Sequence, residues 1–136
     1  MPAFETNSPL RYPGGKAVLS DFLAATIEAN GIEDCTYVEP YAGGAGAAIN
    51  LLLAGKVARI VLNDADRSVW SFWHSILHHT DAFIELIKTT PVSVAEWKKQ
   101  RAIYHARPRR IVELGFAAFY LNRCNRSGII MNGGPI

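Results

Sequence analysis

The sequence predicts an α/β protein in which one strand–helix–strand unit is followed by a run of helices. Two short apolar stretches, "CTYVEP" and "ARIVLND", flank a loop rich in glycine and alanine that turns helical before Gly55. Strand, glycine loop, helix and strand in this order are typical of a right-handed βαβ unit with parallel strands. Beyond Asp66 the apolar residues recur only at helical spacing, so no third strand of the sheet is expected.

In the first half, "LRYPGGK" (10–16) predicts a turn, because proline presets its own φ and glycine allows unusual backbone angles. Helical spacing of apolar residues predicts a helix over 18–29, closed by "ANG". Pro40 stops the strand of "CTYVEP", and residues 47–54 form a helix that ends at Gly55.

In the second half, Asp66 or Ser68 can cap a helix that runs to about residue 79. Further helices are expected over 81–88, 94–105 and 109–124. In the helix that Asp66 or Ser68 caps, the expected core face consists of Trp70, Trp73, Ile76 and Leu77. His74 and His78 have i, i+4 spacing, but no third ligand is obvious and no metal site is expected.

The composition indicates one ordinary globular chain, with 136 residues of which 49% are hydrophobic and 19% charged. Cys35 and Cys124 form no C-x-x-C pair, so they read as reduced thiols of a cytoplasmic protein. The first residues lack a signal-peptide pattern, and no apolar run approaches the length that spans a membrane. We therefore expect no membrane partner.

The glycine loop is the clearest functional signal in the chain. Glycines let a ligand approach the backbone, and the N–H groups that open the following helix point toward that ligand. Gly44-x-Gly46 matches the start of a dinucleotide fingerprint, but Ile49 stands where the third glycine would be. Asp64 ends the next strand about 20 residues on, where an acid can bind two ribose hydroxyls. The alternative is that the glycines only permit a tight turn.

Glu39 helps to choose the ligand. A carboxylate just before the loop would repel a dianionic pyrophosphate. S-adenosylmethionine has no phosphate and carries an ammonium and a sulfonium, which an acidic strand end favours. The alternative is that Glu39 and Asp64 are solvated surface carboxylates.

Four stretches in order carry a family resemblance, and they extend from about residue 9 to the end of the chain. They are "LRYPGGK" (10–16), "VEPYAGGAG" (38–46), "VLNDAD" (61–66) and "FAAFYLNRCNRSGI" (116–129). Together they resemble the N-terminal portion of the D12-class (Dam-like) DNA adenine-N6 methyltransferases. The resemblance implies a partial Rossmann-like S-adenosylmethionine-dependent methyltransferase fold and site-specific DNA methylation, as in restriction-modification.

The resemblance also implies site residues. Tyr12 and Lys16 would contact the methyl donor, and Asp64 would accept hydrogen bonds from its ribose hydroxyls. The loop beneath the methionine part of the donor would consist of Glu39, Tyr41, Gly43 and Gly44. The residues that would face DNA are Asn122, Arg123, Asn125, Arg126 and Ser127. The family often has an aromatic residue near the position of Arg126, so the arginine leaves an intercalating role there in doubt. The alternatives are a solvated Lys16 and a Tyr12 that packs on the first helix.

The second half is strongly basic. Eight of the fourteen Lys and Arg residues lie between 98 and 126, where only Glu113 offsets them. Such a cluster favours contact with the phosphates of double-stranded DNA, while a solvated helix face is the alternative. The eight residues are Lys98, Lys99, Arg101, Arg107, Arg109, Arg110, Arg123 and Arg126.

The family's catalytic Asp/Asn-Pro-Pro-Tyr/Phe tetrapeptide is absent, because the chain contains no Pro-Pro pair. We therefore expect a truncated chain without catalytic residues: a donor-binding portion over 1–92 and the helical, basic start of the target-recognition region over 93–136. We expect it to be inactive alone. A two-stranded parallel sheet leaves open edges, which predicts self-association or a need for the missing C-terminal portion. The alternatives are a non-catalytic DNA-binding or split-subunit module and, ranked last, a piece of a dinucleotide-dependent oxidoreductase.

Overall fold

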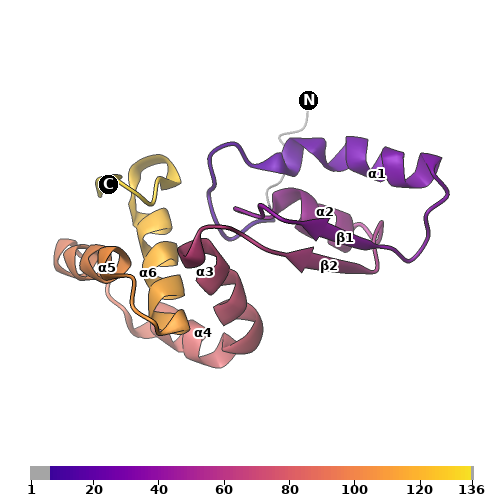
Figure 1. The fold of residues 1–136 in the computed structure, drawn as a ribbon. Coiled ribbons are helices and arrows are strands. Elements are labelled where there is room, and N and C mark those ends of the chain that lie inside the picture. The colour runs from indigo at the N-terminus through magenta and orange to yellow at the C-terminus, as the bar shows by residue number, and fades with distance from the viewer. Residues whose placement is uncertain (1–6, 136) are drawn as a thin grey trace. The chain divides into compact units, whose positions relative to one another are not determined.

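The computed structural model describes residues 7–135, which form six α-helices, two short 3-10 helices and one two-stranded parallel sheet (Figure 1). The predicted α/β class is confirmed. The chain divides into two compact units, one comprising Met1–Pro9 and Gly14–Asn63 and the other Leu10–Pro13 and Asp64–Ile136. This division by compactness falls between Asn63 and Asp64, whereas the functional division into 1–92 and 93–136 stays a prediction.

The first unit contains the predicted strand–helix–strand order. The region expected to be one helix over 18–29 begins earlier, with a 3-10 turn that leads directly into an α-helix. The elements are η1 (Lys16–Leu19), α1 (Ser20–Ala29), β1 (Thr36–Glu39), α2 (Gly46–Leu53) and β2 (Arg59–Leu62).

The two strands pair in parallel, as predicted, with Glu39 opposite Leu62. The pairing continues beyond the strands, because the Asn63 N–H donates to the Glu39 carbonyl at 3.0 Å. The Ala42 N–H then donates to the Asn63 carbonyl at 2.8 Å. The ends of both strands therefore hold the start of the glycine loop in place.

In the first unit, α2 is the element that contacts all the others. α2 contacts both strands, and η1 and α1 pack against α2. The Cα atoms of Val38 and Val61 face each other across the ladder, and both side chains are exposed, by 55% and 45%. Parallel sheets are usually covered on both faces, so this apolar pair marks an open face.

A glycine fixes the approach of η1 to α2. A Cβ added to Gly46 would lie 2.9 Å from the Cβ of Ala17, closer than such atoms come in real proteins. Because the two backbones are packed this tightly, the position of Lys16, the residue before Ala17, is set by the start of α2.

The second unit is helical, as predicted. Asp66 is the N-cap of its first helix, since one carboxylate oxygen accepts a hydrogen bond from the Ser68 N–H at 2.8 Å. The other candidate cap, Ser68, lies inside the first turn. The elements are α3 (Arg67–His78), α4 (Thr80–Thr89), α5 (Val94–Ala106), α6 (Ile111–Cys124) and η2 (Arg126–Gly128).

α6 is the central helix of the second unit and packs against both α3 and α5 (Figure 1). Where α6 meets α3, a Cβ added to Gly115 would lie 2.6 Å from the carbonyl oxygen of Ser71. The two backbones therefore touch at this point. Around it lies an aromatic cluster in which neighbouring ring centroids are 5.6 to 6.4 Å apart, formed by Phe72, Phe83, Phe116 and Phe119.

The predicted core face of α3 is only partly right. Trp73 is buried, but Leu77 is 64% exposed, so its assignment to the core was wrong. The fully buried stripe instead contains three serines, Ser68, Ser71 and Ser75. At Ser71 the small side chain accompanies the close approach of the α6 backbone at Gly115, and apolar periodicity does not report such a contact.

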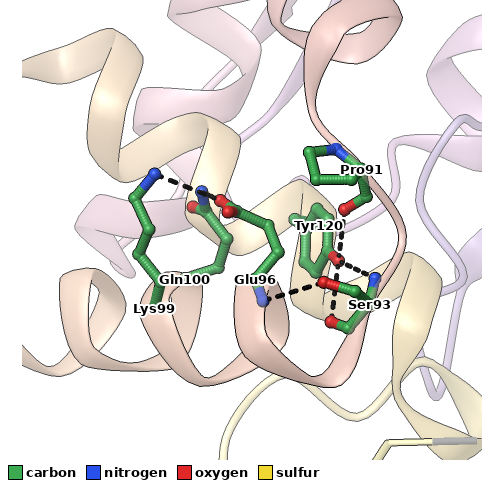
Figure 2. Close-up of polar contacts among 6 residues, drawn as sticks. All are labelled: Pro91, Ser93, Glu96, Lys99, Gln100 and Tyr120. Carbon is green, nitrogen blue, oxygen red and sulfur yellow. Dashed lines mark hydrogen bonds and ion pairs between the residues drawn. The ribbon is translucent and has the colours of Figure 1, made fainter.

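The start of α5 is held by a polar network around Tyr120 (Figure 2). Ser93 caps the helix by accepting a hydrogen bond from the Glu96 N–H at 3.1 Å. The Tyr120 hydroxyl donates to the Pro91 carbonyl at 3.0 Å and accepts from the Ser93 N–H at 3.3 Å. This buried tyrosine therefore ties α6 to the turn that precedes α5.

Both cysteines, Cys35 and Cys124, are free thiols in the structure. Among residues 7–135 no helix has the length and apolarity needed to cross a bilayer. The same residues contain no cluster of three or more His, Cys, Asp or Glu side chains that could hold a metal ion.

Candidate functional site

Glu39, at the end of β1, is a buried carboxylate. The residue is only 2% exposed, and the Lys16 Nζ lies 2.9 Å from its Oε1. Neither of its oxygens accepts a well-oriented hydrogen bond from any residue that the structure describes. The alternative of a solvated surface carboxylate is therefore wrong for Glu39. Buried carboxylates normally accept several hydrogen bonds, so the arrangement leaves acceptor capacity unused.

Lys16 joins the turn before η1 to the glycine loop. Besides the ion pair with Glu39, its Nζ donates a hydrogen bond to the Tyr41 carbonyl at 2.6 Å. The reading of Lys16 as an ordinary solvated lysine is therefore wrong as well. Tyr41 as a residue is 73% exposed, and it contributes to the cluster through its backbone carbonyl.

The glycine loop has a left-handed backbone and an uncapped helix start. Gly43 and Ala45 both have φ near +50°, a region that glycine adopts readily and alanine only at a cost. Ala45 is the N-cap of α2 and, having only a methyl group, offers no side-chain acceptor to the first turn. The N–H groups in the first turn of α2 have no side-chain cap, and such groups are suited to receive an anionic group.

Two further predicted residues, Tyr12 and Asp64, belong to the second unit. Burial first, and then the charges of Asp64 and Asp66, raise the pKa of Tyr12, so its phenol is neutral at physiological pH. Asp64 accepts a hydrogen bond from the Asp66 N–H at 2.9 Å, which orients its carboxylate within the turn before α3. The structure thus places Tyr12 near both acids.

Tyr12 also lines a hollow of about 390 Å³ in the second unit, together with Asp66 and Tyr104. The Arg107 guanidinium lies 5.8 Å from the Tyr104 ring centroid and 3.7 Å from an Asp66 oxygen. Sequence reasoning missed Tyr104 and Asp66 as neighbours of Tyr12. The available signal was the position of Tyr104 on the buried face of α5, which by itself indicates packing.

Asn122 joins the first and last of the motifs that carry the resemblance. It is fully buried, its Oδ1 accepts from the Arg11 N–H at 2.9 Å, and its Nδ2 donates to the Arg11 and Gly128 carbonyls, both at 2.7 Å. A Cβ added to Gly128 would lie 2.4 Å from the Arg11 oxygen, so glycine is required at this contact. The amide is thus occupied in holding the backbone together.

Asn125 is buried in the same way. Its Oδ1 accepts from the Trp97 indole N–H at 2.7 Å, and its Nδ2 donates to the Ile129 carbonyl at 2.7 Å. Because the side chains of Asn122 and Asn125 have no exposed surface, this structure gives them an anchoring role and offers neither to DNA.

The other three residues expected to face DNA, Arg123, Arg126 and Ser127, are exposed. The basic cluster is also on the surface, and we call its eight cations the basic face. Two of them have acidic partners, since Lys99 lies 3.5 Å from Glu96 and Arg107 lies 3.7 Å from Asp66. The described residues supply no ion pair for the remaining six, which are Lys98, Arg101, Arg109, Arg110, Arg123 and Arg126.

These features define a class: α/β proteins whose parallel strand–glycine loop–helix–strand unit carries an acid at the end of each strand. The family model for the D12 class N6 adenine-specific DNA methyltransferase matches residues 12–129. Because this match covers most of the chain, the chain belongs to that family, and the resemblance is confirmed. A search of curated proteins returned no match.

Proposed function

We propose that this chain binds S-adenosylmethionine as the methyl donor for adenine-N6 methylation of double-stranded DNA. The observation that carries the proposal is the buried Glu39 carboxylate with unused acceptor capacity, beside the uncapped start of α2. Membership of the D12 class supports the reaction type.

The chemistry of the donor fits these groups. Its methionine part carries an ammonium, which a buried carboxylate binds through charge-assisted hydrogen bonds, and a carboxylate, which a helix N-terminus attracts. In this proposal Glu39 accepts from the ammonium, while Gly43 and Gly44 let the methionine part approach the backbone. Lys16 and the Tyr41 carbonyl, which are hydrogen-bonded to each other, complete this side of the proposed donor site.

Asp64 is the proposed acceptor for the two ribose hydroxyls, and Tyr12 is proposed to contact the donor through its ring. Asp64 follows Asn63 directly in the chain, and Asn63 is paired with the backbone of Glu39. We also propose that β1 and β2 belong to a Rossmann-like methyltransferase sheet. The exposed Val38 and Val61 would then be covered by self-association or by a further methyltransferase portion, and a strict monomer in light scattering at high concentration would contradict the first of these.

We propose further that these 136 residues do not methylate DNA by themselves. The lone pair of the adenine amine is delocalised, so the base must be flipped out and its amine must receive hydrogen bonds in the site. The family's Asp/Asn-Pro-Pro-Tyr/Phe tetrapeptide supplies this, and the sequence has no Pro-Pro pair. Turnover by the isolated chain in a methyl-transfer assay on adenine-containing duplex would refute this proposal.

For DNA we propose contact through Arg123, Arg126, Ser127 and the basic face, with Asn122 and Asn125 holding the segment in shape. A non-catalytic DNA-binding or split-subunit module is the second candidate, because the basic face does not depend on a donor site. Donor binding separates the two candidates.

Calorimetric titration of the full chain with S-adenosylmethionine and with S-adenosylhomocysteine tests the proposal. We expect both ligands to bind and Asp64→Ala to weaken each by about tenfold or more, since hydrogen bonds to a charged group contribute about 1.5–3 kcal/mol. Glu33→Ala, which removes an exposed acid from a loop, is the matched control and should bind as the parent does. DNA binding without donor binding would favour the second candidate, and NADH binding would favour an oxidoreductase.

A further inference from the structure

We infer that Lys16 is a specificity-determining residue that sets how strongly the site prefers the methyl donor over the demethylated product. The inference rests on the proposed binding of S-adenosylmethionine. It concerns the net charge that the site presents to the sulfur of its ligand. Donor binding by itself does not determine that charge.

The observation is that the carboxylate proposed to bind the ligand already has a cation of the protein beside it. The Lys16 Nζ lies 2.9 Å from Oε1 of Glu39, and no other described residue forms an ion pair with that side chain. Glu39 is 2% exposed whereas the Lys16 side chain is 37% exposed, so solvent reaches the pair only from the lysine side. The cluster therefore presents a net charge close to zero.

Lys16 is held in this position from two directions. Its Nζ has a second acceptor in the Tyr41 carbonyl at 2.6 Å, and its backbone is fixed because Ala17 packs against Gly46. The ammonium pairs with Oε1, while Oε2 takes part in neither the ion pair nor a hydrogen bond from a described residue. Oε2 is buried and has no described partner, so we assign it as the oxygen that accepts from the ammonium of an entering ligand while Lys16 keeps Oε1.

Donor and product differ at a single atom that matters here. S-adenosylmethionine has a positively charged sulfonium, whereas S-adenosylhomocysteine has a neutral thioether, and both carry the same ammonium and carboxylate. A near-neutral Lys16–Glu39 pair exerts little net field on the sulfur, so charge contributes little to the discrimination. Without the lysine charge, Glu39 would attract the sulfonium and leave the thioether unaffected.

The test measures the ratio of the Kd for S-adenosylhomocysteine to the Kd for S-adenosylmethionine by calorimetry on the full chain. We expect Lys16→Met to raise this ratio by about tenfold, which is the size of effect that a unit charge exerts at roughly 10 Å in a partly screened site. Glu39→Gln leaves the lysine charge uncompensated and should move the ratio below that of the parent. The double variant restores neutrality and should return the ratio to the parent value.

Three controls separate charge from structure. Lys16→Arg keeps the charge and should keep the parent ratio. Lys56→Met removes a lysine of the same unit whose partner, Glu28, is exposed, so it should not change the ratio. Sinefungin, which has a protonated amine in place of the sulfonium, should follow the donor in every variant.

The outcomes distinguish the inference from the function on which it rests. If the parent chain binds neither ligand, the proposed function fails. If both ligands bind but the ratio is the same in the parent, Lys16→Met and Glu39→Gln, or moves in one direction in both variants, the role of Lys16 is overturned. Should Lys16→Met fail to fold, a ratio in Glu39→Gln at or above the parent value would overturn it equally.

Discussion

At the residue scale, one buried amide connects segments that are far apart in the sequence. Asn122 satisfies both the N–H and the carbonyl of Arg11 and, in addition, the Gly128 carbonyl. These groups lie in the first and the last of the motifs that resemble the family. The exposed residues proposed to meet DNA, Arg123 and Arg126, directly flank this anchor and its neighbour Asn125.

Replacing Asn122 with alanine should destabilise the chain by about 3 kcal/mol, because it leaves several buried polar groups without partners and each such group costs about 1–3 kcal/mol. Equilibrium unfolding in urea measures the change. Asn30→Ala removes an exposed amide whose one side-chain bond among the described residues is to the nearby Thr26 carbonyl, and it should cost less than about 1 kcal/mol. Equal losses in the two variants would show that Asn122 is not an anchor.

Glu39 and Asn122 also show what the sequence can and cannot predict for single residues. The position of Glu39, between a strand and a glycine loop, predicts an acid next to a ligand. The role of Asn122 depends on Arg11, which is 111 positions away in the chain. No local pattern reports such a contact, so the sequence favoured a surface role for this amide.

At the element scale, the sequence predicts most of the secondary structure. Strands and helices occur where apolar periodicity and cap residues place them, and Asp66 is an example of a cap that the structure confirms. The error lies on one face of α3, where Leu77 is exposed and Ser71 is buried. Apolar periodicity identifies large apolar side chains. It does not report that the α6 backbone comes close to α3 at Ser71, where the side chain is small and buried.

Gly115→Ala tests that close approach. Alanine is the better helix former by about 1 kcal/mol, yet a methyl group here would meet the Ser71 carbonyl at 2.6 Å. We expect a net destabilisation of about 1–3 kcal/mol in thermal or denaturant unfolding, as for other overpacked cores.

The exposed position Ala102 in α5 supplies the reference for helix propensity. Ala102→Gly should cost about 0.5–1 kcal/mol, since glycine is the poorer helix former and nothing is packed there. A Gly115→Ala variant that is more stable than the parent would mean that α3 and α6 are not in backbone contact.

At the scale of the whole molecule, charge is unevenly distributed. The net charge is only +2, but eight of the fourteen basic residues form the basic face, where a single acid lies between Lys98 and Arg126. The order of residues in the sequence predicts this imbalance, and the structure adds that all eight side chains are exposed. Phosphate contact needs that exposure.

The double variant Arg123→Ala/Arg126→Ala should weaken DNA binding and lower the slope of log K against log [salt] by about 2, since each phosphate contact contributes about one unit. Fluorescence anisotropy on a labelled duplex at several salt concentrations measures the slope. A control that removes two exposed cations elsewhere, Lys88→Ala/Arg59→Ala, should leave the slope within about 0.5 of the parent value. A slope unchanged by the arginine substitutions would place the DNA contacts elsewhere.

The claim on which the whole account depends is that Glu39, at the tip of β1, binds the ammonium group of the methyl donor. A crystal structure of the full chain with S-adenosylhomocysteine tests it most directly. We predict that the amino group of the ligand lies within hydrogen-bond distance of a Glu39 oxygen and that its carboxylate faces the start of α2. A ligand bound away from Glu39, with the glycine loop unchanged and unoccupied, would contradict the account.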